Sequence, residues 1–345
     1  MTGIYIHWPY CLSKCPYCDF YSRVDPLINQ DDIINSYIDD IKFYKQYVDD
    51  NISTVFFGGG TPSLINPYNI EKIVNYIYKE FKTENLEISL EANPNTNHPN
   101  MFKDLKAAGI NRLSLGIQSL NQDNLNFLER SHNKEEALNA IEDVLETFDN
   151  HSMDIMLGLP QSEDFSFVKG LGFKHLSVYQ LTIEEGTAFY KRGYEDIEEE
   201  KAIELYKQTK EALSGYNRYE VSNYCQTGFE CKHNMGYWQG LDYMGIGKGA
   251  HGRLKMNATT HHRQIEKLSP EERAEELLLM GLRIYEGINK ERFYTQCGLK
   301  FDDFINQKNL NSLKQQALIL DDKKTIKVTD KGFYLLNKII EDLAV

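Results

Sequence analysis

Residues 3–18 read GIYIHWPYCLSKCPYC, an apolar run followed at once by three closely spaced cysteines. The apolar run has the length and the Ile and Tyr content of a buried strand. Cys11, Cys15 and Cys18 follow it in a loop that begins with Pro9, so their thiols can all turn to one side. Thiolates select zinc, copper(I) or iron–sulfur clusters. The stretch therefore predicts a thiolate metal centre directly after a strand.

Two kinds of metal centre compete for this spacing. A structural zinc site needs four ligands in a closed tetrahedron, but the residue two positions after the third cysteine is Phe20. A [4Fe–4S] cluster held by three thiolates leaves one iron open to bind another molecule. We expect the cluster. The alternatives are zinc with a distant fourth ligand, or three unrelated core cysteines.

The first half of the chain alternates short apolar runs with longer amphipathic stretches. The expected strands are residues 3–8, 53–57, 86–90, 111–116, 151–156 and 175–179. The expected helices are residues 31–48, 68–81, 100–108, 134–148 and 162–169. Such alternation predicts parallel strands joined by right-handed crossovers. Six units predict an α/β fold, a partial (β/α)6 barrel of the TIM type, with its active residues in the loops after the strands.

The character of the sequence changes near residue 195, where the strand–helix alternation ends. A long charged helix, an irregular segment rich in Gly and Tyr, and a mainly helical tail follow. Two short apolar runs in the tail flank a hairpin-like turn, which indicates a winged-helix-like shape. The expected units are a barrel core over 1–195, a barrel extension over 196–260 and a small helical domain over 261–345.

Composition excludes several classes of protein. The 345 residues are 41% hydrophobic, which is enough for a sizeable core and excludes wholesale disorder. With 38 basic and 51 acidic residues the net charge is −13, which disfavours non-specific binding of nucleic acid or anionic lipid. There is no run of 18 apolar residues and no secretory pattern at the start. We expect a cytoplasmic protein without a membrane span, whose cysteines stay reduced.

A series of motifs in order along the chain resembles the radical S-adenosylmethionine (radical SAM) superfamily. Within it, the chain is similar to the HemW-type heme chaperones, relatives of the oxygen-independent coproporphyrinogen III oxidase HemN. The motifs are IYIHWPYCLSKCPYCDFYS, FFGGGTPS, EANPNT, RLSLGIQS, DIMLGLP, HLSVYQLTIEEGT and HNMGYW. The resemblance implies that Cys11, Cys15 and Cys18 hold a [4Fe–4S] cluster. It also implies that S-adenosyl-L-methionine (SAM) chelates the open iron.

The resemblance implies a SAM pocket built from residues at or just past the strand ends. Those contacts are Tyr5, Tyr17, Gly59, Gly60, Thr61, Glu91, Gln118, Arg130 and Asp154. Glycines let the backbone approach a ligand, and a carboxylate can accept hydrogen bonds from a ribose or an ammonium group. Taken singly, each residue fits equally well as a tight turn or an ordinary ion-paired side chain. The ordered set favours the ligand interpretation.

The HNMGYW motif is associated in this branch with heme binding. His233 could ligate heme iron, and the rings of Tyr237 and Trp238 could offer flat faces to the macrocycle. The alternative is a core patch with a hydrogen-bonded histidine, which the spacing alone would favour. If the motif is not the heme site, the other candidates for the ligand are His251, His261 or His262. A second thiolate site at Cys225 and Cys231 is disfavoured because the spacing is not a common zinc pattern.

Two departures separate the sequence from the oxidase pattern. Phe20 stands where the oxidase has a further cysteine, and the first strand begins too early for an N-terminal extension that would cover the site. We therefore expect a heme chaperone that delivers heme to heme-dependent proteins such as respiratory enzymes. A homodimer is a further hypothesis. The alternative is oxygen-independent coproporphyrinogen III oxidation. Whether SAM is cleaved in the working cycle stays open.

Overall fold

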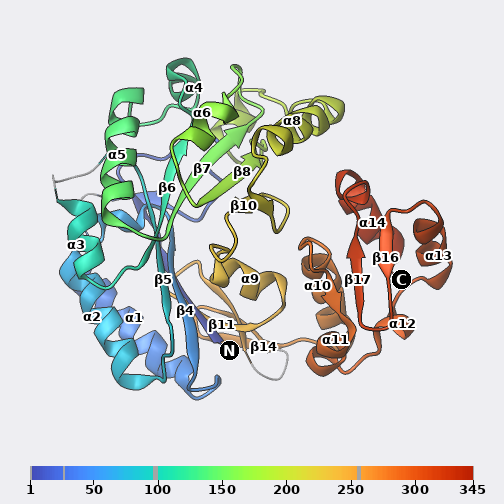
Figure 1. Cartoon of the computed structure of the whole chain (residues 1–345). Coiled ribbons are helices and arrows are strands. Elements are labelled where there is room, and N and C mark those ends of the chain that lie inside the picture. Colours follow the sequence, from blue (N-terminus) through green and yellow to red (C-terminus); the bar gives the residue numbers. More distant parts are fainter. Residues whose placement is uncertain (1, 26–27, 96–99, 255–257, 345) are drawn as a thin grey trace.

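The computed structural model describes residues 2–25, 28–95, 100–254 and 258–344. Figure 1 shows a large α/β unit beside a smaller C-terminal domain. Six parallel strands form the centre of one sheet. They are β1 (Thr2–Trp8), β4 (Ile52–Gly59), β5 (Glu87–Ala92), β6 (Arg112–Gln118), β7 (His151–Leu157) and β8 (His175–Gln180). All six expected strands are thus confirmed within a few residues at each end.

Helices cross from each strand to the next along the outer face of the sheet (Figure 1). They are α1 (Gln30–Lys45), α2 (Pro67–Glu80), α3 (Met101–Ala107), α4 (Gln122–Phe127), α5 (Lys134–Thr147) and α6 (Phe165–Gly170). In α1 the apolar stripe of Ile34, Tyr37, Ile38 and Ile41 is buried against the sheet. Asparagine side chains cap the amino ends of α1, α2, α4 and α5, so the crossovers begin where the sequence offers a capping residue.

Shorter strands extend the sheet at both edges. At one edge β11 (Asp242–Ile246) pairs in parallel with β1, and β12 (His251–Leu254), β13 (Ala258–His261) and β14 (Gln264–Lys267) follow in antiparallel order. The other edge carries β10 (Asn223–Cys225) and β9 (Asn217–Arg218). The strand order runs from β14 to β9 without returning, so the sheet is an incomplete barrel, as expected.

The segment expected to be irregular, residues 216–251, contains much of this extension. Besides β9, β10 and β11 it holds α9 (Lys232–Trp238), which carries the HNMGYW motif. The charged helix before it is α8 (Glu199–Ala212). The remaining short elements of this unit are β2 (Tyr10–Cys11), β3 (Arg23–Val24), the 3-10 turn Pro62–Leu64 and α7 (Ala188–Lys191).

The C-terminal domain has a hydrophobic core of its own, running from Ala274 to Leu343. Its elements are α10 (Pro270–Gly281), β15 (Ile288–Asn289), α11 (Lys290–Cys297), α12 (Phe301–Phe304), α13 (Gln307–Gln315), β16 (Ile319–Asp321), β17 (Thr325–Val328), the 3-10 turn Gly332–Leu335 and α14 (Leu336–Leu343). Helices alternating with a small three-stranded sheet form the winged-helix-like shape. The expected boundary between residues 260 and 261 falls inside β13, so the structural division lies further along the chain.

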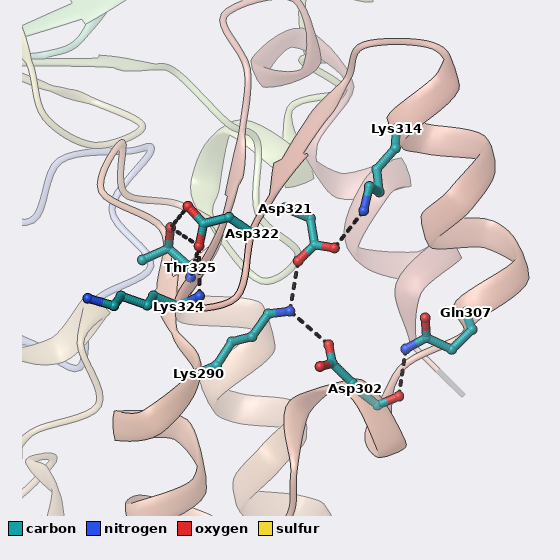
Figure 2. Close-up of polar contacts among 8 residues, drawn as sticks. All are labelled: Lys290, Asp302, Gln307, Lys314, Asp321, Asp322, Lys324 and Thr325. Carbon is teal, nitrogen blue, oxygen red and sulfur yellow. Dashed lines mark hydrogen bonds and ion pairs between the residues drawn. The ribbon is translucent and has the colours of Figure 1, made fainter.

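Ion pairs of Lys290 connect the small sheet of this domain to its helices (Figure 2). Lys290 Nζ lies 2.8 Å from carboxylate oxygens of both Asp302 and Asp321, and Lys314 pairs with Asp321 at the same distance. The side chains of Lys290 and Asp321 are only 13% and 11% exposed. The pair is therefore shielded from water and fixes β16 against the start of α11.

The two units meet at the chain that follows α9. Arg273 Nη2 and Gln296 Nε2 both donate to the carbonyl of Gly240, at 2.6 and 2.7 Å. The amide of Tyr285 donates to the carbonyl of Tyr219 at 3.0 Å. In the part of the chain that the structure describes, no helix is long and apolar enough to cross a membrane.

Candidate functional site

A cavity of about 420 Å³ opens at the carboxyl ends of the parallel strands and continues into the barrel. The cysteine loop forms one wall, and the ends of β4, β5, β6 and β7 form the others. Eleven of the fifteen predicted site residues line this cavity. They are Cys11, Cys15, Tyr17, Cys18, Gly59, Gly60, Thr61, Glu91, Gln118, Arg130 and Asp154. The strand–loop placement inferred from the sequence therefore gathers residues from six separate segments.

The three cysteines are free, half-buried thiols on the wall of the same cavity. The amide of Cys18 donates to the carbonyl of Cys15 at 3.1 Å, which folds this part of the loop into a turn. Among the described residues, no three His, Cys, Asp or Glu side chains are placed to hold a single metal ion. Three thiols on the wall of one cavity can serve as ligands of one metal centre.

The glycine loop after β4 packs against the start of the cysteine loop. The amide of Gly60 donates to the carbonyl of Trp8 at 2.7 Å, and the amide of Thr61 donates to that of Tyr10 at 2.9 Å. A Cβ atom on Gly60 would lie 2.7 Å from the Tyr10 carbonyl oxygen, closer than real contacts allow. Gly59 has a φ of 110°, which only glycine adopts readily. The glycines thus bring two loop backbones together at the cavity wall.

Two carboxyl groups, Glu91 and Asp154, line the cavity. Burial and, to a lesser extent, the carboxylate of Asp154 together raise the pKa of Glu91 to about 8. Burial also raises the pKa of Asp154, while hydrogen bonds from Ser177 and Ser114 oppose that rise. Glu91 accepts a hydrogen bond of 3.3 Å from the amide of Gly59. A cationic ligand between the two carboxyl groups would relieve their repulsion.

Arg130 connects the cysteine loop to the strand ends. Its Nη2 donates to the side-chain oxygen of Asn93 at 2.6 Å and to the carbonyl of Gly116 at 3.0 Å. Its Nη1 donates to the Tyr17 hydroxyl at 3.2 Å and lies 3.5 Å from Cys15 Sγ. The guanidinium therefore contacts two residues of the loop, one residue of β6 and the residue that follows β5.

An irregularity at the end of β6 turns Gln118 toward the cavity. The pairing of β6 with β7 shifts register between Gly116 and Gln118, and Gln118 has a φ of 67°. Its Oε1 accepts a 2.5 Å hydrogen bond from the hydroxyl of Tyr179 on β8. Bulges of this kind redirect side chains at functional sites.

Tyr5 does not line the cavity. Its hydroxyl bonds to Nδ1 of His7 at 2.9 Å, and its ring lies beneath Gly58, where a Cβ would approach it to 3.0 Å. The ring packs under the glycine loop, and the predicted ligand contact of Tyr5 stays a prediction.

Sequence reasoning missed the polar floor of the cavity. The floor includes Asn93, Arg112, Ser114, Ser177, Tyr179, Ser222, Asn223 and Asn234. Arg112 is only 2% exposed, and its Nε has no hydrogen-bond partner among the described residues. The signal for Arg112 was available, because it opens the RLSLGIQS motif. Asn93, Ser114, Ser177, Tyr179 and Asn234 also lie within the quoted motifs, whereas Ser222 and Asn223 come from a segment with no recognisable pattern.

The HNMGYW motif lies on α9 (Figure 1), which contacts β1 and β4. His233 is 2% exposed and uses both ring nitrogens, Nδ1 with the Thr54 hydroxyl at 2.8 Å and Nε2 with the Tyr237 hydroxyl at 2.7 Å. Its ring stacks on Phe56. One of these hydrogen bonds would have to break before heme iron could reach the corresponding ring nitrogen. This geometry matches the alternative of a hydrogen-bonded core histidine.

The other members of the motif face in different directions. Asn234 lines the cavity, whereas Trp238 borders a small pocket between α9 and the C-terminal domain. Trp238 and Tyr237 therefore do not form one open face for a macrocycle. Cys225 and Cys231 are fully buried, and burial raises the pKa of both thiols. Such thiols behave as core residues.

Comparisons with known proteins agree with the site. Residues 5–169 match the Radical SAM superfamily, and residues 268–335 match the HemN C-terminal domain. Heme chaperone HemW of Buchnera aphidicola subsp. Acyrthosiphon pisum is 34% identical over 98% of this chain and 97% of its own length. HemW of Haemophilus influenzae shows the same identity and coverage. HemW of Bacillus subtilis is 30% identical over 98% of both chains.

The overall fold also has a solved counterpart. Coproporphyrinogen III oxidase HemN from Escherichia coli superposes with a TM-score of 0.81, covering 99% of this chain and 89% of its own. The sequences are 21% identical, so this likeness concerns the fold alone. The full-length identity to the HemW proteins, together with the three cysteines at the mouth of a strand-end cavity, shows that the chain belongs to the HemW family of the radical SAM superfamily.

Proposed function

We propose that this chain is a heme chaperone that binds heme and transfers it to heme-requiring proteins in the cytoplasm or at the membrane. The observation that carries the proposal is the match to proteins named heme chaperones over nearly the whole length of both chains. The shared length includes both the barrel and the C-terminal domain. A homodimer is part of the proposal, because a carrier could use a second copy to enclose its cargo.

The proposal includes a [4Fe–4S] cluster and SAM, which membership of the superfamily implies. Cys11, Cys15 and Cys18 are the proposed cluster ligands, because their half-buried thiols line one cavity. When bound together, the cluster and SAM supply one-electron chemistry. The cavity suits a zwitterion with a sugar, since it offers two carboxyl groups, a glycine loop and the polar groups of Thr61 and Gln118.

The chain's own residues bind and position these groups. Glu91 and Asp154 are placed to accept hydrogen bonds from an ammonium group or a ribose. Arg130 holds the cysteine loop against β5 and β6, which keeps the thiols at a fixed distance from the carboxyl groups. The close approach of the glycine loop to the cysteine loop narrows the entrance and limits access of water.

Anaerobic reconstitution followed by heme titration tests the proposal. Purified protein is loaded with iron and sulfide, and hemin binding is followed by its Soret band, with a coproporphyrinogen III oxidation assay run on the same sample. Stoichiometric heme binding without protoporphyrinogen formation supports the chaperone. Steady formation of protoporphyrinogen would instead show that the function is that of the oxidase. If the isolated protein contains zinc and no sulfide, the proposed [4Fe–4S] cluster is wrong.

The Cys15→Ser variant tests the assignment of this residue as a cluster ligand. It should lose the iron–sulfur absorbance while keeping the fold, because Cys15 is half-buried in a loop rather than packed in the core. Unchanged absorbance in this variant would contradict the ligand assignment.

A further inference from the structure

An imidazole that takes up heme iron from solution needs a ring nitrogen that is exposed and unused. Most histidines of the chain do not meet that condition. Five of those that the structure describes are buried, namely His7, His132, His151, His175 and His233. Three others are exposed and close together in sequence on one hairpin, namely His251, His261 and His262.

Two of the exposed histidines form a pair across neighbouring strands. His251 on β12 and His261 on β13 are direct partners in the antiparallel ladder. Their ring centroids lie 4.9 Å apart with an angle of 35° between the rings. Neither ring makes a side-chain hydrogen bond to another residue within the described ranges, so the nitrogens are open to solvent. His262 lies in the turn after β13 and does not belong to the pair.

An exposed aromatic ring and a cation lie at the loop that leads into β12. A Cβ on Gly249 would come within 2.6 Å of the Tyr21 ring, so the loop two residues before His251 packs on Tyr21. Tyr21 is 46% exposed, and Lys248 Nζ lies 5.8 Å from the centre of its ring. An aromatic surface, an ammonium group and an imidazole are the groups that recognise a porphyrin plane, a propionate and an iron.

We propose that His251 and His261 form the heme-iron site of this protein, with Tyr21 against the porphyrin and Lys248 toward a propionate. The inference rests on the proposed function, and it assigns the cargo to a place outside the cavity. Both imidazoles approach from the same side of the hairpin, whereas the two axial positions of heme iron lie on opposite faces. One of the pair therefore ligates at a time, and the other is a second ligand within reach.

The protonation state of His251 supports ligation by its ring at neutral pH. Burial lowers the pKa of His251, and the charges of His261 and Arg253 lower it further. Arg253 itself is bound to Glu276 by two hydrogen bonds and stays in place. A neutral imidazole is the form that binds iron.

The proposed heme site would also bring the heme into contact with the loop that carries the cluster ligands. Tyr21 follows Cys18 by three residues, and its carbonyl accepts a 2.9 Å hydrogen bond from Nε2 of His7. His7 Nδ1 in turn contacts the Tyr5 hydroxyl beneath the glycine loop. Heme resting on Tyr21 would therefore contact the same loop that carries the cluster ligands.

The test compares hemin binding by the full chain with that of three variants. We expect His251→Ala and His261→Ala each to weaken binding by a few-fold, because either imidazole can ligate. The double variant should weaken it at least tenfold and lose the spectrum of imidazole-ligated iron. Free imidazole added to the double variant should restore that spectrum. His262→Asn, which removes an imidazole from the same hairpin and tolerates the left-handed backbone there, is the matched control and should bind like the unmodified chain.

Iron-free protoporphyrin IX separates iron ligation from contact with the ring. Its binding, followed by fluorescence, should be the same in the double variant and in the unmodified chain, but weaker in Tyr21→Ala. If the unmodified chain binds hemin and the double variant binds it equally well with the same spectrum, the inference is overturned while the proposed function stands. If the unmodified chain binds no hemin at all, the proposed function fails and the inference fails with it.

Discussion

The guanidinium of Arg130 lies 3.5 Å from the sulfur of Cys15 and 2.6 Å from the side-chain oxygen of Asn93. One side chain therefore connects a proposed cluster ligand to the end of β5. Because the guanidinium is planar and its donors point in fixed directions, it sets the distance between loop and sheet in a way that a flexible ammonium would not.

Replacing Arg130 by lysine tests this connection. We expect Arg130→Lys to lower the affinity for the cluster about tenfold or more, in line with other residues that orient metal ligands. Iron and sulfide per chain after anaerobic reconstitution give the measurement. Glu129→Gln is the control, because Glu129 is the residue next to Arg130 but pairs with Arg192 at the surface. Equal iron content in both variants would rule out the positioning role.

The raised pKa of Glu91 predicts how SAM binding depends on pH. Below a pKa of about 8 the carboxyl group is mostly neutral, so it binds a cationic ligand poorly. The affinity for SAM should rise with pH by up to about tenfold per unit between pH 6 and 8 and then level off. Calorimetric titrations of the reconstituted protein measure this slope. In Glu91→Gln the slope should flatten, and an unchanged slope would exclude Glu91 as its source.

The lowered pKa of His233 predicts that the folded protein loses stability in acid. Burial lowers its pKa to about 3, while in the unfolded chain the value is near 6.5. The stability that depends on the neutral ring is therefore complete above pH 6.5 and falls as the pH drops toward 3. Between pH 6.5 and 5 the loss amounts to about 2 kcal/mol. Urea unfolding at both pH values measures it.

Two variants isolate this effect of His233. His233→Gln should lower the free energy of unfolding by about 2 kcal/mol at pH 7.5, because Thr54 and Tyr237 lose their partner. The same variant should have a shallower acid slope but keep part of it, because burial also lowers the pKa of His132, His151 and His175. Tyr237→Phe removes one hydrogen bond but keeps the imidazole, so it should destabilise the fold and retain the slope. Parallel slopes in all three proteins would contradict the assignment.

The ion pairs of Figure 2 predict a local effect in the C-terminal domain. Lys290→Met leaves Asp321 with Lys314 alone and should destabilise this domain by about 2 kcal/mol, because the lost pair is largely buried. Lys314 is 40% exposed, so Lys314→Met should cost about 1 kcal/mol or less. Hydrogen exchange of residues 270–344 measures both. SAM binding should be unaffected, and a matching loss of protection in the barrel would contradict a local role.

The sequence predicted most of the barrel because the central strands are apolar runs and most of them are followed by a helix with a capping side chain. It also predicted which residues lie at the strand ends, since parallel strands present their carboxyl ends on one side. The edge strands β9 to β14 were missed. They are two to five residues long, and several are polar, so they owe their conformation to pairing with β1 and β8 rather than to local pattern.

The role of single residues depended on packing that no motif contains. His233 and Asn234 are adjacent in the sequence, but helix α9 turns the imidazole toward Thr54 and the amide toward the cavity. The pairing of His251 with His261 likewise follows from the register of β12 and β13, which the sequence does not reveal. Spacing identified the region of the site, whereas the backbone decided which atoms face it.

Helix α9 borders both halves of the molecule. Asn234 lines the floor of the cavity, and Trp238, four residues or about 6 Å further along the helix, touches the pocket against the C-terminal domain. A rigid turn of helix cannot tilt at one end and stay still at the other. A protein that docks on the C-terminal domain and displaces α10 would therefore reshape the base of the cavity, which gives a recipient a mechanical route to report its arrival.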